Sequence, residues 1–304
     1  MKGDIAVVGS INLDVIVKTP SYPNYGETVF CNEIDFRPGG KGANQAVTIS
    51  KMQQNPLMIG AVGKDSSGKQ VLENLKRKGI DASYILSVNN VTGSFIAMID
   101  KFGENTMVGT KGANEAITES YIDSVFSQIE ASILLIQMET SKESILASVK
   151  AAKERGIYVV LDPAPADGIF HEVFPYVDLI LPNQQETKKI TSVEVTDKKS
   201  AEKAADKLHL LGISNAMVKM GSEGVLVSVN GVKTFIDSIN VKAVDTVGAG
   251  DCFAGVVASQ LLYTKDLVKV ARLATIAAGI KVSRPGGHDS LPTLKEVKTY
   301  KVKE

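Results

Sequence analysis

The sequence is poor in cysteine, in net charge and in long apolar runs, and each shortage excludes a class of protein. Only Cys31 and Cys252 occur in 304 residues. Two thiols are too few for a disulfide framework or a structural zinc site, and they fit a reducing compartment. The 34 basic and 34 acidic residues cancel, so nothing concentrates positive charge as a nucleic-acid partner requires.

Membrane and export signals are also missing. The apolar runs, such as residues 254–262, are much shorter than a membrane span. Asp4 interrupts the N-terminal segment where a signal peptide needs an apolar stretch. We therefore expect a cytoplasmic protein with neither a membrane nor a nucleic-acid partner.

Several catalytic signatures are absent. There is no Gly-x-Ser-x-Gly elbow for a hydrolase triad, and the three histidines lack metal-ligand spacing, so we expect them to be structural or surface residues. Gly9-Ser10-Ile11 lacks the further glycines of a dinucleotide fold. Gly63–Lys69 nearly matches a P-loop, but Gln70 stands where a P-loop needs Ser or Thr. We interpret this segment as a loop that opens a helix over 68–78, with no apolar strand running directly into it.

Most of the chain alternates strands with helices, which predicts an α/β fold. Residues 140–143 have capping-box spacing before a helix that ends near Arg155, and a second helix is expected over 201–211. Asn230-Gly231 suits the type I′ turn of a hairpin between strands 225–229 and 232–236. The other strands expected in this sheet are 5–8, 133–137, 157–161, 177–181 and 216–219. Such a chain forms a mostly parallel sheet with helices on both faces, and it binds ligands at the carboxyl ends of the strands.

A second, smaller sheet is expected from strands that have no helix between them. Residues 94–100 and 105–110 flank a four-residue turn and predict a hairpin. The nearly alternating segment 12–17 and the ragged strand 29–36 can join that hairpin. In the first of these, polar Asn12 and Asp14 fall on one face.

The stretch Asp245–Asp251 places two glycines between two aspartates, where a predicted strand over 239–244 meets a buried helix over 252–263. Gly248 and Gly250 leave no side chain in the way of a ligand. Amides at the start of a helix have no intrahelical partner, so with the helix dipole they form an anion site. Asp251 at its edge is placed to accept a proton from a hydroxyl that attacks phosphorus. The alternative is a tight turn with Asp251 as helix N-cap.

Other polar residues also fall at strand ends or in glycine-rich loops. Lys41 and Asn44 add donors to the loop Arg37–Ala46, and Glu139 follows a strand, where it can accept sugar hydroxyls or be solvated. Asn183 and Glu186 have the spacing to bind magnesium through water. They could equally cap the start of a helix.

Four blocks of the sequence, in order and at matching intervals, resemble the ribokinase-like (PfkB) family of carbohydrate kinases over essentially the whole length. These blocks are Gly9–Asp14, Pro38–Gln45, Pro182–Glu186 and Asp245–Asp251. The resemblance implies a single ribokinase-like domain over residues 1–304, a Rossmann-like three-layer α/β fold with a small β-sheet lid. It also implies transfer of phosphate from ATP to O5 of D-ribose.

The resemblance further implies a role for each matching residue. The sugar-contacting set would be Asn12, Asp14, Gly40, Lys41, Asn44, Glu139 and Asp251, with Asp251 as catalytic base. The anion hole would be formed by the backbone amides of Gly248, Ala249, Gly250 and Asp251. The nucleotide would be lined by Asn183, Lys219, Gly221, Gly224, Gly250 and Thr275, the last at a position where some members carry His or Asn.

Two metal ions follow from the same resemblance. Glu186 would order Mg²⁺ through water, although Gln184 replaces a Glu often seen after the Asn of the family. Members that act on ribose also bind a monovalent cation, usually K⁺, beside the anion hole. The positions that match its ligands, several of them through backbone carbonyls, are Asp245, Val247, Lys281, Arg284, Gly286 and Ser290.

Two rival functions remain open from the sequence. One is a kinase of the same family for deoxyribose, fructose or a nucleoside, and the other is a sugar-binding regulator without catalysis. Asn12, Asp14 and Glu139 favour a polyhydroxylated pentose, and the intact Asp251 with its glycines argues against a regulator, because a binder needs neither.

The small sheet is expected to expose its edges and apolar residues. Val15, Val17, Phe95 and Ile99 belong to its strands. Pairing two such sheets would cover them. We therefore expect a homodimer through the lid.

Overall fold

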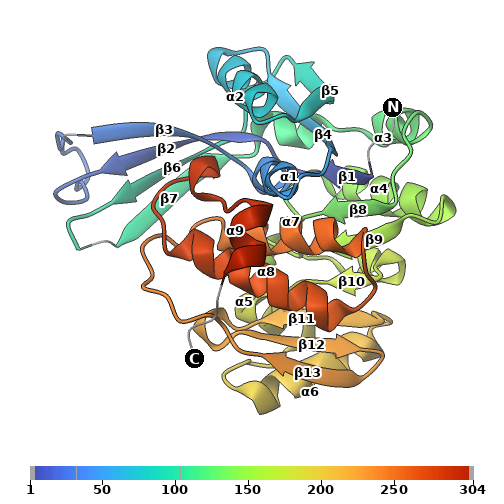
Figure 1. The fold of residues 1–304 in the computed structure, drawn as a ribbon. Coiled ribbons are helices and arrows are strands. Elements are labelled where there is room, and N and C mark those ends of the chain that lie inside the picture. The colour runs from blue at the N-terminus through green and yellow to red at the C-terminus, as the bar shows by residue number, and fades with distance from the viewer. Residues whose placement is uncertain (1–3, 32, 103, 301–304) are drawn as a thin grey trace.

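A computed structural model describes residues 4–31, 33–102 and 104–300. In that part, nine strands form one sheet in the order β13-β12-β11-β10-β9-β8-β1-β4-β5 (Figure 1). Neighbours from β5 to β11 run parallel, while β12 and β13 are antiparallel. The strands are β1 (Ile5–Val8), β4 (Pro56–Gly63), β5 (Asp81–Val88), β8 (Ile133–Ile136), β9 (Tyr158–Leu161), β10 (Leu179–Ile180), β11 (Asn215–Lys219), β12 (Val225–Val229) and β13 (Val232–Ile236). The predicted α/β class with a mostly parallel sheet is confirmed.

Both faces of the sheet are covered because its strands are apolar on both sides. In β1, Ile5 and Val7 pack into one core, while Ala6 and Val8 pack into the other. The first core is closed by α1 (Lys41–Lys51), α2 (Ser66–Arg77), α7 (Ala249–Leu261), α8 (Leu267–Val282) and α9 (Leu294–Thr299). The second is closed by α3 (Glu119–Phe126), α4 (Lys142–Glu154), α5 (Gln184–Thr191) and α6 (Lys198–Leu210). None of the helices in the described ranges is long and apolar enough to cross a bilayer.

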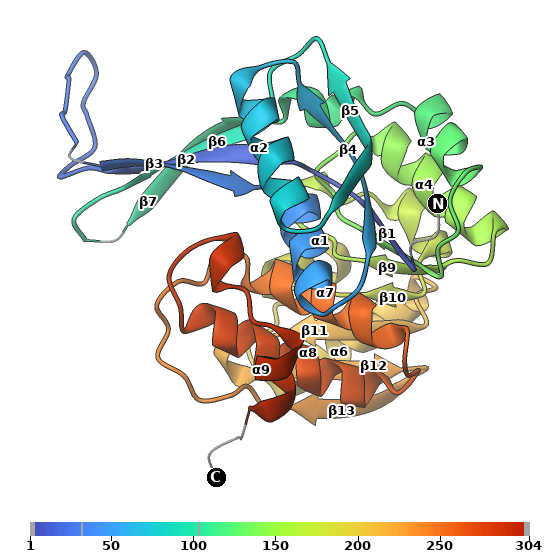
Figure 2. The same ribbon diagram turned by 45° about the horizontal axis from the view of Figure 1, so that its top comes forward.

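A separate four-stranded sheet projects from the body as an arm, in the order β3-β2-β6-β7 (Figure 2). Its strands are β2 (Asn12–Lys18), β3 (Glu33–Gly39), β6 (Ser94–Ile99) and β7 (Asn105–Thr110). We call it the lid sheet. β2 follows β1 after residues 9–11, so the lid sheet is continuous with strand β1 of the main sheet.

Two predicted strands differ from the structure. β3 begins at Glu33, so residues 29–31 of the predicted segment 29–36 are not strand, and residue 32 lies outside the described residues. Residues 239–244 alternate like a strand but pair with no strand of the described ranges. The amide of Val244 instead donates to the carbonyl of Val282, 2.8 Å away, at the end of α8. Alternation could not show that the segment lacks a neighbouring strand.

The segment 63–69 also differs in one respect. The fully buried strand β4 does run directly into it, contrary to the expectation. The interpretation as a helix-opening loop is nevertheless confirmed, because α2 starts at Ser66 and the Asp65 side chain accepts from the amide of Gly68 at 2.7 Å. A carboxylate at that helix start takes the place where a P-loop holds phosphate.

Candidate active site

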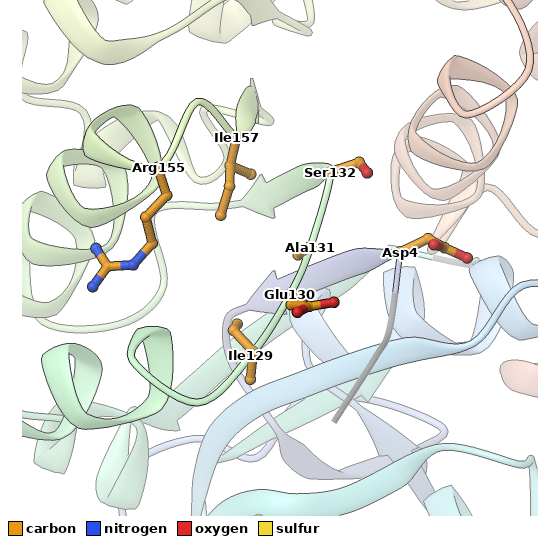
Figure 3. A pocket seen from close by; sticks show the side chains of 7 residues that line it. All are labelled: Asp4, Ile129, Glu130, Ala131, Ser132, Arg155 and Ile157. Atoms are coloured by element: carbon orange, nitrogen blue, oxygen red, sulfur yellow. The ribbon is translucent and has the colours of Figure 1, made fainter.

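The polar residues singled out from the sequence gather at the carboxyl ends of the parallel strands, around the starts of α1 and α7. Glu139 follows β8, Lys219 ends β11, and Asp251 lies in the first turn of α7. A hollow of about 340 Å³ lies at the opposite edge, before β1, β8 and β9 (Figure 3). Asp4, Ser132 and Ile157 line it at the amino ends of these strands. That hollow is therefore distinct from the candidate site.

Helix α7 begins at Ala249, three residues earlier than the sequence suggested, so the glycine stretch forms its first turn. Gly248 is the N-cap, with φ 76°, a backbone conformation that favours glycine. Among the described residues, the amides of Gly250 and Asp251 have no hydrogen-bond acceptor, while that of Ala249 donates to the carbonyl of Thr246 at 3.2 Å. Two free donors at the positive end of a helix form a site for an anion.

Asp251 is held rigidly beside this anion site. It is 6% exposed. Asn44 Nδ2 donates to its Oδ2 at 2.8 Å, and Gln45 Nε2 donates to its Oδ1 at 3.1 Å. Burial raises the pKa of the Asp251 carboxyl above its ordinary value, and the positive charge of Lys41 opposes that rise. The carboxylate is oriented as a proton acceptor and is made more basic than an exposed aspartate.

A second buried carboxylate shares a donor with the first. Gln45 Nε2 also donates to Asp162 Oδ2 at 2.9 Å, and its Oε1 accepts from Gln137 Nε2 at 2.7 Å. Lys219 Nζ lies 3.0 Å from Asp162 Oδ1. A methyl group on Gly250 would lie 3.7 Å from this ammonium, which places Lys219 beside the anion site.

The lid contributes the other end of the site. Asn12 is 3% exposed, and its Oδ1 accepts from Asn114 Nδ2 at 2.8 Å. Asp14 Oδ1 accepts from the amide of Phe95 at 3.1 Å. Burial raises the pKa of Asp14 to about 6, partly opposed by the bond from Phe95.

The start of α1 joins the lid to the body. Gly40, its N-cap, has φ 88°, and a methyl group there would lie 2.6 Å from the carbonyl oxygen of Ser10. Ser10 Oγ donates to Glu139 Oε2 and accepts from the amide of Lys41 at 2.9 Å. Burial acts to lower the pKa of the Lys41 amine, but the carboxylates of Asp251 and Glu139 outweigh it and raise that pKa. Lys41 is therefore a firmly charged donor between the two carboxylates.

Asn183 and Glu186 form the helix start that was one of their two interpretations. Asn183 caps α5, and its amide donates to Glu186 Oε2 at 2.7 Å in a complete capping box. Burial raises the pKa of Glu186, the ammonium of Lys219 opposes the rise, and Asp162 adds to it. A magnesium ion would relieve the repulsion between the two buried carboxylates, so the residues fit that metal. No group of three or more acidic, histidine or cysteine side chains in the described ranges could hold a metal ion alone.

The remaining nucleotide positions come from the turn after β11 and from α8. Gly221 and Gly224 flank the single turn that connects β11 to β12. Thr275, on α8, is 8% exposed, and within the described part of the chain its hydroxyl has no hydrogen-bond partner. An unpaired buried hydroxyl is consistent with a ligand contact at this position.

The positions that match potassium ligands do converge, but around an ammonium. Lys281 Nζ donates to the carbonyls of Asp245 at 3.4 Å and Gly286 at 3.1 Å. Ser290 Oγ donates to the same Gly286 carbonyl at 2.7 Å. The guanidinium of Arg284 pairs with Glu296, 2.7 Å distant, and Val247 is 72% exposed, so these two positions could contribute only their backbone carbonyls. These residues do not fit a potassium ion, because a side-chain cation already takes the carbonyls.

Sequence reasoning gave no role to several residues that orient the site. Gln45 and Asp162 position the base, Asn114 holds Asn12, and His288 Nε2 lies 2.9 Å from Asn44 Oδ1. Asp162 follows β9 directly, so the strand-end rule that found Glu139 could also have found it. His209 and His288 are hydrogen-bonded within the fold, whereas His171 is exposed; burial lowers the pKa of His288 to about 4.

Comparison with known proteins agrees with this geometry. The family model described as pfkB family carbohydrate kinase matches residues 2–294. A ribokinase of Haemophilus influenzae is 36% identical over 97% of both chains, and a deoxyribokinase of Salmonella typhi is 31% identical over 98% of both. The structure of Arabidopsis thaliana ribokinase complexed with ribose and ATP superposes with a TM-score of 0.91 at 30% identity, covering 98% of each chain. This chain therefore belongs to the pfkB family of carbohydrate kinases.

Proposed function

We propose that the chain is a ribokinase, which transfers the γ-phosphoryl group of ATP to O5 of D-ribose and releases D-ribose 5-phosphate and ADP. One observation carries this function. The Asp251 carboxylate lies between sugar-binding candidates and two amides that have no acceptor among the described residues. A base and an anion hole on one helical turn are what direct phosphoryl transfer to a hydroxyl needs.

The residues of the chain divide the work between the two substrates. Asn12, Asp14 and Lys41 bind and orient the sugar so that its hydroxyl meets Asp251, which accepts the proton as the oxygen attacks phosphorus. The amides of Gly250 and Asp251 hold the negative charge of the transferred group. Nucleophile and leaving group lie in line, and no covalent enzyme intermediate forms.

Lys219 and Glu186 serve the nucleotide. The ammonium of Lys219, beside Gly250, is placed to neutralise phosphate charge. Glu186 would hold Mg²⁺ through water, and the ion would neutralise the phosphate charge when bound. Thr275 and the Gly221–Gly224 turn complete the nucleotide side.

Ribose is preferred here over deoxyribose, fructose or a nucleoside because buried Asn12 and half-buried Asp14 place two hydrogen-bonding side chains on the lid. A site built to pair with hydroxyls rejects an analogue that lacks one, because its own polar groups are then left unpaired. A panel of these substrates in an ADP-release assay tests the choice. A clear preference for a hexose, a nucleoside or deoxyribose would overturn it, and ribose binding without any transfer would instead indicate a regulator.

We further propose a homodimer through one face of the lid sheet. Phe36, Val15, Ile96 and Val108 lie opposite one another across its four strands and form a continuous apolar row. Phe36, Ile96 and Val108 are 54%, 42% and 64% exposed. Asp14 points to the other face, since side chains alternate along β2, so a partner on the apolar face leaves the sugar side open. Phe95 and Ile99, also expected at the interface, share that inner face.

The proposed place of action is the cytoplasm. Cys31 and Cys252 are free thiols, which persist in a reducing compartment. Burial raises the pKa of Cys252 to about 12, so this thiol packs α7 rather than reacting.

A further inference from the structure

Lys281 is a fully buried lysine whose role the reaction scheme above does not use. It lies near the end of α8, is 1% exposed, and is one of the largest fully buried side chains among the described residues. A charged group is retained in such a place only when polar partners replace water. Its partners are two backbone carbonyls and one carboxylate, those of Asp245 and Gly286.

These partners are the ligand chemistry of a potassium site. Potassium is held in proteins by carbonyl and carboxylate oxygens that replace its water shell. Here the carbonyls of Asp245 and Gly286 and the Asp245 carboxylate, 3.6 Å away, surround Nζ of Lys281 instead. An ammonium carries the same single charge as potassium and has three donors for three oxygens.

The side chain of Lys281 lies beside Gly248, the residue that caps α7 at the anion site. A methyl group on Gly248 would lie 3.8 Å from Cε of Lys281 and 4.0 Å from Oδ2 of Asp251. The charge of Lys281 also acts to lower the pKa of the Cys252 thiol, although burial outweighs it. Cys252 follows Asp251 directly in the first turn of α7. A fixed positive charge here adds to the helix dipole that faces the transferred phosphoryl group.

The same side chain ties together the loops that shape the anion hole. The Asp245 carboxylate accepts from the amides of Val247 at 3.0 Å and Gly286 at 3.2 Å. Lys281 bonds the carbonyls on both sides of that contact. It therefore holds the loop before α7 against the loop after α8, as a shared cation would.

A potassium ion could not enter beside this ammonium without sharing its oxygens. Asp245 is the carboxylate that pairs with Lys281 in the described part of the chain, and Arg284 is turned away to Glu296. A second cation would meet a buried like charge and would have to share the Asp245 carboxylate with it.

We propose that the ε-ammonium of Lys281 permanently takes the place of the monovalent cation, so that phosphoryl transfer by this chain does not depend on potassium. The inference deepens the proposed function, and its kinetic test rests on that function. It concerns the cation requirement of the same site.

The kinetic experiment compares full-length wild type with Lys281→Ala and Lys281→Met. ADP release is measured with ribose and MgATP in potassium-free buffer, with tetramethylammonium as counter-ion, and then with added KCl. Wild type is expected to change less than about twofold, since its anion hole is already charged. Lys281→Ala removes charge and bulk, so it loses about tenfold or more without potassium and regains most of that with it. Lys281→Met fills the space without charge, so it loses activity and potassium does not restore it.

Lys269→Ala, which removes an exposed lysine from the same helix, is the matched control and is expected to behave as wild type. Strong activation of wild type by potassium overturns the proposal, as does a Lys281→Ala variant that stays active and indifferent to potassium. If that variant does not fold, the response of wild type alone decides.

Thermal unfolding supplies a readout that needs no activity. A cation that binds only the folded state raises its Tm. KCl is expected to stabilise Lys281→Ala more than tetramethylammonium chloride does, and to have no such selective effect on wild type. Selective stabilisation of wild type by KCl contradicts the proposal. If no sugar is phosphorylated at any potassium concentration, the proposed function fails, and the unfolding data still test the ammonium site.

Discussion

Replacing Asp251 by asparagine removes the proposed base with the smallest change of shape. The carboxylate accepts from Asn44 and Gln45, whereas an asparagine has one acceptor oxygen and one NH₂ group. Gln45 cannot simply turn over, because its oxygen accepts from Gln137 and its nitrogen also serves Asp162. The NH₂ group of either Asn44 or Gln45 therefore faces the NH₂ group of the introduced asparagine and loses its acceptor.

The two consequences differ in size. One unpaired donor costs about 1–3 kcal/mol of folding free energy, and removal of a buried charge offsets part of that cost. Loss of the base is expected to lower kcat by about 10²–10⁴-fold, which is about 2.7–5.5 kcal/mol of transition-state stabilisation. The rate should therefore fall far more than the stability.

The assay follows ADP release at saturating ribose and MgATP, and calorimetry follows ribose binding. Asp266→Asn is the matched control, because Asp266 caps α8 away from the site and asparagine caps a helix about as well as aspartate. We expect the Asp251→Asn variant to bind ribose and transfer poorly, and the control to be unaffected. A variant with near-normal kcat would refute the assignment of the base, and one that lost ribose binding as well would show that Asp251 acts mainly in positioning.

Four further outcomes follow from the geometry. The rate of wild type is expected to fall as pH falls through the raised pKa of Asp251, because only the deprotonated form accepts a proton; Lys41→Met removes the charge that opposes that rise, so the acid limb of the kcat profile should move to higher pH. Protonation of Asp14, whose pKa is about 6, is expected to raise KM for ribose at lower pH, and Asp14→Asn should abolish that dependence; an unchanged KM profile would exclude Asp14 from the sugar site. Gly40→Ala meets a carbonyl at 2.6 Å with φ 88°, so denaturant titration should show a loss of about 1–3 kcal/mol. Ile96→Lys puts a charge into the exposed apolar row, so sedimentation should show a monomer where wild type is a dimer, and a monomeric wild type would contradict the lid interface.

Most strands of the main sheet were predictable because buried parallel strands are short, continuous apolar runs bounded by turn residues. Strand β4, also buried along its whole length, was missed because a buried strand has no alternation to identify it and Gly60 interrupts its apolar run. The strand expected at 239–244 shows the opposite error, since its sequence alternates but it pairs with no strand of the described ranges.

The site residues were predictable where chemistry sits at a strand end or in a glycine stretch, as for Asp251 and Lys41. The residues that orient them were not. Gln45 and Asp162 are 117 positions apart and meet only in the folded chain. Lys281 was placed at the potassium site by resemblance, yet the direction of its side chain, and so the conflict with potassium, required coordinates.

The short link between β1 and β2 has a mechanical consequence. Asn12 and Asp14 lie on the arm, while Asn44 and Asp251 lie on the body, and residues 9–11 join the two. On the proposed function, a sugar that contacts both groups would bridge the lid sheet and the body, so its binding energy would favour a closed arrangement of the two over the reacting phosphate. Substrate capture and protection of ATP from wasteful hydrolysis would then be one and the same movement.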